Sequence, residues 1–191
     1  ENARAAVEQA AVALGATEMV SLPESDRARA AAFVITASEA GAFYLNELRE
    51  HAGDFEPLSR DRLIAGALLP SAWYIKAQRF RRWYQEEARK LFERFDLLIA
   101  AATPCTATAI GAERMTCNGV ELPVRPNLGL LTQPISFIGL PVAVAPLWCA
   151  GALPIGVQLI APPWREDICL RAAWVLQQSG IASSPVTGIS G

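Results

Sequence analysis

Histidine is nearly absent from this sequence, and its cysteines form no close pairs. The 191 residues include one histidine, His51, and four cysteines without a Cys-x-x-Cys pair. A zinc site or a disulfide framework needs closer spacing or more ligands, so neither is predicted. We interpret the cysteines as reduced residues in or near the core of a cytoplasmic protein, because thiols stay reduced in that compartment. They are Cys105, Cys117, Cys149 and Cys169.

Charge and long apolar runs are also scarce. Charged residues make up 19% of the chain and the net charge is −2, whereas a nucleic-acid partner normally requires a basic patch. Pro and Gly interrupt every apolar run before it reaches the roughly 18–20 residues that cross a bilayer. The first residues, 1–6, lack the apolar stretch of a signal peptide. We therefore expect no nucleic acid and no membrane as partner. The 52% of hydrophobic residues favours a buried core.

No familiar catalytic constellation is present in the sequence. A Ser-His-Asp triad would need His51 as its base, but no G-x-S-x-G elbow accompanies it, and a loop-packing or surface role is the alternative. Cys105 with His51 is formally possible as a Cys–His pair, although nothing marks either residue as activated. No Gly-rich loop matches a nucleotide-binding fingerprint, and no metal or organic cofactor is implied. The residues alone assign no catalytic group.

Apolar residues recur at helical spacings of three and four along much of the chain. The spacing predicts helices over residues 1–14, 27–49, 59–69, 71–95 and 168–178. Ser25 is a plausible N-cap for the second, and Gly15 and Gly180 provide stops for the first and the last. Basic residues line the helix over 71–95. They can be interpreted either as a solvated helix face or as a face that binds an anion.

Short apolar segments between these helices predict strands. They are residues 18–23, 96–104, a hairpin over 114–122, and two strands within 132–148 and 153–160. Asn118-Gly119 is a favourable hairpin turn, and the last two strands are each entered through a Pro. The helix, turn and strand at the start are typical of the second half of a βαβ unit, so the chain is expected to start in mid-fold. The pattern predicts an α/β fold with a mixed sheet covered by helices on both faces.

Three ordered segments carry a resemblance to a known family. The segment 96–104 is a strand that runs into Thr-Pro, and 136–146 reads S-x-x-G-x-P-V-x-x-x-P. The segment 153–160 reads L-P-x-G-x-Q-x-I and is followed by Glu166. Together they resemble the C-terminal signature of the amidase-signature hydrolases. Ser136 and Val142 depart from the pattern, since many members have Asn and Ala there.

Further segments are similar to one subgroup, the biuret-type amidohydrolases of the cyanuric acid pathway. These segments are residues 29–39, 72–74, 77–82 and 129–134. The resemblance implies that residues 1–191 are the C-terminal part of a single amidase-signature domain. It implies amide C–N hydrolysis of a small urea or biuret derivative, such as 1-carboxybiuret, by a Ser–cis-Ser–Lys triad. A homo-oligomer is also implied, as is a small accessory subunit.

The implied triad has no counterpart in this sequence. Its residues belong to a Gly/Ser-rich core, whereas the only adjacent serines here, Ser183-Ser184, precede a Pro near the C-terminus. We therefore expect the triad outside this chain, and the chain alone to be inactive. A glutamyl-tRNA amidotransferase A-type subunit or a general amidase is the alternative within the family. A non-catalytic scaffold or binding fragment is the alternative outside it.

Substrate recognition is the role that the resemblance transfers to this chain. The segment Arg62-Leu-Ile-Ala-Gly66 is similar to an R-x-x-x-G segment of the A-type amidotransferase subunits, whose Arg binds the substrate carboxylate. A guanidinium matches a carboxylate bidentately, so Arg62 is a candidate carboxylate ligand. The alternative is a surface salt bridge with a neighbouring acid. Thr103, Thr132 and Gln133 are further pocket candidates, for which ordinary turn hydrogen bonding is the alternative.

Overall fold

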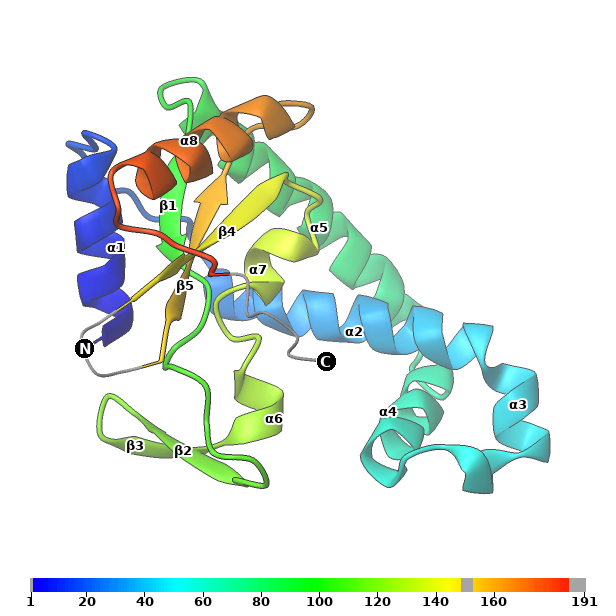
Figure 1. The fold of residues 1–191 in the computed structure, drawn as a ribbon. Helices are drawn as coiled ribbons and strands as arrows, with labels where there is room; N and C mark the ends of the chain where they lie inside the picture. Colours follow the sequence, from blue (N-terminus) through cyan, green and yellow to red (C-terminus); the bar gives the residue numbers. More distant parts are fainter. Residues whose placement is uncertain (1, 149–152, 186–191) are drawn as a thin grey trace. The chain divides into compact units, whose positions relative to one another are not determined.

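The computed structural model describes residues 2–148 and 153–185, which form two compact units. Residues 22–88 form one of them, called here the helical unit. Residues 1–21 and 89–191 form the other, called here the sheet unit (Figure 1). Each unit is described by itself. That residues 1–191 belong to a single domain stays a prediction.

The helical unit consists of consecutive helices, as the apolar spacing predicted. They are α2 (Ser25–Phe43), α3 (Leu45–Glu50), the 3₁₀ turn η1 (Ala52–Asp54), α4 (Pro57–Ala67) and α5 (Ser71–Phe92), whose last turn belongs to the sheet unit. Among the residues that the structure describes, no helix has both the length and the apolarity to cross a membrane.

Two details of the second predicted helix were wrong. Ser25 is its first helical residue and not its N-cap, because Glu24 occupies the cap position with a left-handed φ of 60° and pairs with Arg27 at 3.1 Å. The helix also does not continue to residue 49. It ends before Tyr44, whose ring packs edge-on against Phe55 at a centroid distance of 5.8 Å. A separate helix, α3, follows.

The start of α4 lies two residues before its predicted position. The Glu56 carboxylate accepts hydrogen bonds from the backbone N–H of Leu58 at 3.3 Å and of Ser59 at 2.8 Å. Pro57 occupies the first turn, where its missing N–H costs nothing. Pro57, which lies outside the predicted helix over residues 59–69, therefore belongs to its first turn.

The sheet unit contains a three-stranded antiparallel sheet in the order β1-β5-β4. Its strands are β1 (Leu98–Ala101), β4 (Val142–Leu147) and β5 (Ile155–Ile160). The central strand β5 is buried along nearly its whole length, and Pro141 and Pro154 precede β4 and β5 as predicted. The connection over residues 149–152, including Cys149, lies outside the described residues. The α/β fold class is confirmed, with these three strands paired antiparallel.

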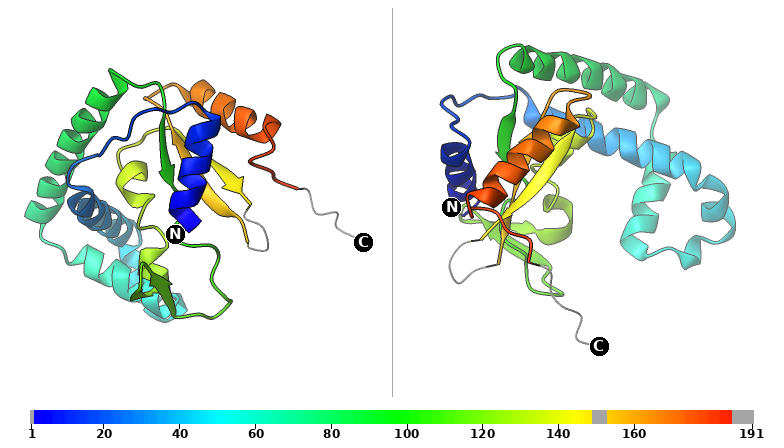
Figure 2. Two further views of the ribbon diagram at one scale, coloured as in Figure 1. Left: turned by 90° about the vertical axis from the view of Figure 1, so that its left-hand side faces the viewer. Right: turned by 45° about the horizontal axis from the view of Figure 1, so that its top comes forward.

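Helices cover both faces of this sheet. On one face, α1 (Asn2–Ala13) and α8 (Glu166–Gln178) pack against alternate residues of β5 (Figure 2). Leu159 and Leu176 are fully buried in this core, and burying such a side chain stabilises the fold by roughly 1.5–3 kcal/mol. The short helix α7 (Gln133–Ser136) follows a segment that is hydrogen-bonded to the opposite face through Gln158.

Turns of the sheet unit follow the predicted turn chemistry. Gly15 and Gly180 have φ of 69° and 75° and end α1 and α8, each helix closing with the paired backbone bonds of a Schellman motif. Asn118 and Gly119, with φ of 50° and 78°, join β2 (Arg114–Cys117) to β3 (Val120–Pro123). Positive φ at both turn residues is what a two-residue hairpin requires. The helix α6 (Val124–Asn127) follows β3.

The strand predicted over residues 18–23 is wrong. Residues 16–22 have no regular secondary structure, and Met19 is 92% exposed. The segment is held by a side-chain contact, since Arg94 Nη2 donates to the Glu18 carboxylate at 2.8 Å. A strand needs a ladder partner, and among the described residues none pairs with this segment.

Candidate functional site

Thr103 lies in the loop that follows β1. Its hydroxyl donates to the backbone oxygen of Cys105 at 2.8 Å, and its side chain is half-buried. A threonine hydroxyl keeps acceptor capacity after it donates, so Thr103 remains able to accept a bond from a ligand N–H. This contact with Cys105 is a turn hydrogen bond, which is the alternative role that the sequence left open for Thr103.

Thr132 and Gln133 begin the turn of α7. The backbone N–H of Gln133 donates to Gly129 O at 3.0 Å, and the Thr132 hydroxyl lies 3.5 Å from the same oxygen. A side chain at position 129 in place of Gly129 would contact Gln133, since an added Cβ would lie 3.3 Å from the Gln133 side-chain amide nitrogen. Both residues are half-buried, and local bonds fix their backbone.

Gln158 connects these two segments, and the sequence prediction missed it as a site residue. Its side chain is 2% exposed, and its Nε2 donates to Ala101 O at 2.8 Å and to Leu131 O at 3.2 Å. Ala101 stands two residues before Thr103, and Leu131 directly precedes Thr132. The structure thus ties the Thr103 loop and the Thr132–Gln133 turn to one side chain of β5. A polar residue inside an otherwise apolar strand was the available signal.

Arg62 lies on α4 in the helical unit and is exposed. Its Nη2 donates to the Thr36 hydroxyl at 2.8 Å, and the Thr36 hydroxyl donates onward to Ala32 O at 2.9 Å. The guanidinium carbon lies 4.8 Å from the centre of the Phe33 ring. Within the described residues Arg62 is therefore held by a hydroxyl and a ring instead of a carboxylate. A guanidinium has five N–H groups, and the Thr36 contact uses one of them.

Two glycines allow α2 and α4 to cross closely enough for these contacts. A Cβ added to Gly66 would collide with the main chain of Ala37, and one added to Gly41 would lie 2.6 Å from Leu63 O. Gly66 follows Arg62 by one turn, and Ala37 follows Phe33 by one turn, so both pairs lie on the facing sides of the two helices. The R-x-x-x-G spacing therefore couples a close helix crossing to the placement of Arg62.

The surroundings of Cys105, one residue of the possible Cys–His pair, do not favour a nucleophilic thiolate. Burial, and then the neighbouring Cys117, raise the pKa of the Cys105 thiol, which disfavours the thiolate nucleophile. His51 is exposed, with Nε2 at 3.9 Å from the Glu50 carboxylate. Across residues 2–148 and 153–185, no three His, Cys, Asp or Glu side chains gather as metal ligands. No residue described here is assigned as a nucleophile.

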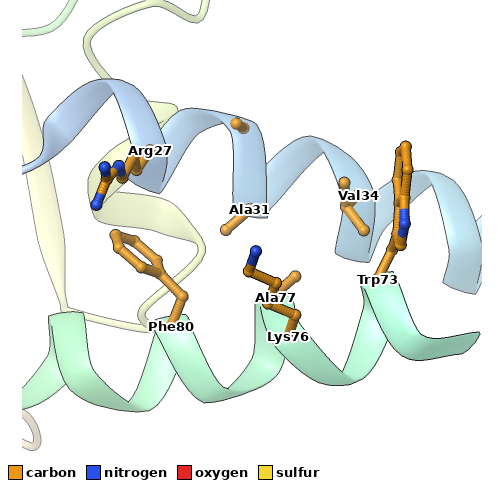
Figure 3. A pocket seen from close by; sticks show the side chains of 8 residues that line it. Arg27, Ala31, Val34, Trp73, Lys76, Ala77 and Phe80 are labelled. Carbon is orange, nitrogen blue, oxygen red and sulfur yellow. The ribbon is translucent and has the colours of Figure 1, made fainter.

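A groove of about 640 Å³ runs between α2 and α5 within the helical unit (Figure 3). Trp73 stands beside Val34 at one end, and Phe80 lies near Arg27 at the other. The Lys76 side chain extends into the space between the helices. The lining contains two cations among apolar groups and no hydroxyl, thiol or carboxylate, so it holds no nucleophile.

Comparison with known proteins agrees with the fold. The sequence matches the amidase family over residues 1–170, and the chain belongs to this family. It is 57% identical to AtzE, the 1-carboxybiuret hydrolase subunit of Pseudomonas sp. (strain ADP), over 94% of this chain and 40% of that protein. It is 31% identical to the A-type subunit of the glutamyl-tRNA(Gln) amidotransferase of Symbiobacterium thermophilum, over 86% of this chain and 38% of that protein.

A solved structure is similar as well. An inhibitor-bound vestigial protein complex, which bears on the evolutionary origin of an s-triazine catabolic enzyme, superposes with a TM-score of 0.90 at 57% identity. The match covers 94% of this chain and 40% of that one. The chain therefore spans about two fifths of the length of the relatives that it matches. The expected amidase-signature membership is confirmed.

Proposed function

We propose that the complete protein containing this chain hydrolyses an amide C–N bond of a small urea or biuret derivative, such as 1-carboxybiuret. The observation that carries the proposal is the 57% identity to a 1-carboxybiuret hydrolase subunit over 182 residues. Family membership alone supports amide hydrolysis in general, whereas identity at this level supports the narrower substrate class.

The proposed reaction is acyl transfer to a serine followed by hydrolysis. A lysine deprotonates the bridging cis-Ser, which takes the proton of the nucleophilic Ser as that oxygen attacks the substrate carbonyl. Backbone N–H groups hold the tetrahedral oxyanion, the amine leaves with a proton, and water then cleaves the acyl-enzyme. We place these three residues outside the chain, because its only adjacent serines are Ser183 and Ser184. The chain alone is then inactive.

Arg62 is proposed to bind the substrate carboxylate. Its guanidinium is oriented by Thr36 and Phe33, yet most of its N–H groups remain for a bidentate bond to a carboxylate. Orienting the fork in advance reduces the entropy lost when the substrate binds. Thr103, Thr132 and Gln133, which belong to the sheet unit, are proposed to line a substrate pocket there with polar groups for a urea, which carries both donors and an acceptor.

Steady-state kinetics of the complete protein test this assignment. Arg62→Ala should raise KM for 1-carboxybiuret by about 10-fold or more, because a charge-assisted bond contributes roughly 1.5–3 kcal/mol. Arg62→Lys should recover only part of the loss, because an ammonium cannot form the bidentate pair. Arg60→Ala on the same helix is the matched control, since Arg60 pairs with Asp61 at 3.1 Å. An unchanged KM in Arg62→Ala would refute the assignment.

A glutamyl-tRNA amidotransferase A-type subunit is the second candidate, supported by the 31% identity over most of the chain. A general amidase is a third within the family, and a non-catalytic scaffold is the candidate outside it. Ammonia release from 1-carboxybiuret, biuret, glutamine and a simple aliphatic amide separates them. Turnover of glutamine would favour the amidotransferase, turnover of the aliphatic amide a general amidase, and no turnover of any substrate by the complete protein a scaffold.

We also propose that the complete protein works as an oligomer with a small accessory subunit. The similar solved structure is a protein complex, which supports the proposal. Size-exclusion chromatography with light scattering on protein co-purified from its native host tests it. A monomer without any co-purifying small chain would contradict both parts.

A further inference from the structure

We propose that Gln158 is a positioning residue, whose buried amide holds the Thr132–Gln133 turn against the end of β1. Its Nε2 contacts Ala101 O and Leu131 O, one in β1 and one directly before Thr132. These two oxygens are 30 residues apart in sequence, and one side chain joins them. The inference rests on the proposed function only in that it assigns the turn to the substrate pocket.

The chemistry of the two partners fixes which way the amide faces. Both are backbone carbonyl oxygens, which only accept hydrogen bonds, so the NH₂ group of Gln158 must face them. With two hydrogens and two acceptors, the donor capacity of the NH₂ group is matched. At 2% exposure the side chain has little access to water, which therefore does not substitute for either bond.

The packing around Gln158 leaves little room for another arrangement. Gly156 stands two residues earlier in β5 and so points to the same face of the sheet. A Cβ there would lie 3.0 Å from Val144 Cγ1 and 3.1 Å from Ala102 Cβ. Both distances are closer than ordinary contacts, so β4 and the end of β1 pack directly over this glycine. The antiparallel pairing of β1 with β5, in which Ala101 lies opposite Val157, places the end of β1 within reach of the Gln158 amide.

Removing the amide should release the turn without removing the sheet. Leu159, the next residue of β5, points to the opposite face and packs in the core with α1 and α8. The turn over residues 129–138 is held by its own local bonds, such as Gln133 N–H to Gly129 O at 3.0 Å, but those do not attach it to the sheet. Gln158 supplies a hydrogen bond from β5 to the residue before Thr132, and a pocket wall misplaced by about 1 Å can cost about 100-fold in rate.

The test compares Gln158→Met with Leu159→Met in the complete protein. Both variants place the same unbranched side chain at adjacent buried positions, but only the first removes the hydrogen-bond donors. Gln158→Met should lower kcat/KM by about 10- to 100-fold, partly through kcat, and should speed hydrogen exchange over residues 129–138. Leu159→Met should change neither. If Gln158→Met keeps kcat/KM within twofold and leaves exchange unchanged, the proposal is wrong.

A measurement on the wild-type protein keeps the proposal testable if Gln158→Met does not fold. Native-state hydrogen exchange in increasing denaturant shows which segments open together. Backbone amides of Gln133 and Ile135 should open with those of β5, because Gln158 couples them. Opening of residues 129–138 alone, at lower denaturant than β5, would overturn the proposal. The exchange data do not depend on substrate, so failure of the proposed function and failure of the positioning role give different results.

Discussion

Substituting Gly66 with Ala tests the helix crossing that places Arg62. In an exposed helix, Gly→Ala stabilises by about 0.8–1 kcal/mol, because Gly loses more backbone entropy on folding. Here the added methyl group would collide with the main chain of Ala37 in α2, and main-chain atoms of a helix cannot rotate away. Helix propensity therefore predicts that Gly66→Ala raises the free energy of unfolding, whereas packing predicts that it lowers it.

The packing term is expected to exceed the propensity term. Overpacking typically costs about 1–3 kcal/mol, and this contact belongs at the upper end because the atoms that must move are backbone atoms. With about 1 kcal/mol returned by propensity, the net loss is about 2 kcal/mol. At about 2–4 °C per kcal/mol for a chain of this size, Tm should fall by about 4–8 °C. The forced separation should also lengthen the 2.8 Å bond between Arg62 and Thr36.

Urea denaturation of the 191-residue chain, followed by circular dichroism, provides the measurement. Gly53→Ala is the matched control, since an added Cβ there has no neighbour within 4 Å, and it should change stability by no more than about 0.5 kcal/mol. A Gly66→Ala variant as stable as the wild type, or more stable, would show that α2 and α4 do not cross closely at Ala37.

Two further predictions concern ionisable groups of the sheet unit. Burial and the neighbouring Cys117 raise the pKa of Cys105, so iodoacetamide should alkylate Cys105 more slowly than a free thiol near pH 8, and faster as pH rises. Peptide mass spectrometry measures the rate of labelling. Labelling of Cys105 faster than that of a free thiol would contradict the described environment. The Arg165 guanidinium is hydrogen-bonded to Asp167 and lowers the pKa of that carboxyl. The pair therefore stabilises the fold above the pKa that Asp167 has in the unfolded chain. This stabilisation is lost as pH falls through the pKa that Asp167 has in the folded protein. Asp167→Asn should therefore flatten the acid side of the stability curve in urea titrations, by a small amount because the pair is exposed, and an equal loss at every pH would contradict the assignment.

Local chemistry in the sequence was sufficient to predict much of the sheet unit. The hairpin follows from Asn118-Gly119, since few other pairs accept positive φ twice in succession. The helix stops follow from Gly15 and Gly180 for the same reason. The strands β4 and β5 follow from their apolar runs and preceding prolines. In each case the determining interactions lie within a few residues of one another.

The features that the sequence did not predict depend on distant residues. The segment at Glu18 has an apolar composition that suits a strand, but its contact is with Arg94, far along the chain. The tight crossing at Gly66 is determined by Ala37 on another helix. In the sequence Gln158 is one polar residue in an apolar strand, and only the structure shows that its side chain donates to the backbone oxygens of Ala101 and Leu131. Long-range pairing of this kind has no periodic signal in a single sequence.

The role of Arg62 as carboxylate ligand is tested most directly by the ratio of kcat/KM for 1-carboxybiuret to that for biuret in the complete protein. The two substrates differ by the carboxylate that Arg62 is proposed to bind. The wild type should prefer 1-carboxybiuret by about 10-fold or more, and Arg62→Ala should reduce this preference toward unity. Equal ratios in the wild type and the variant would contradict this role, as would an absence of turnover with either substrate.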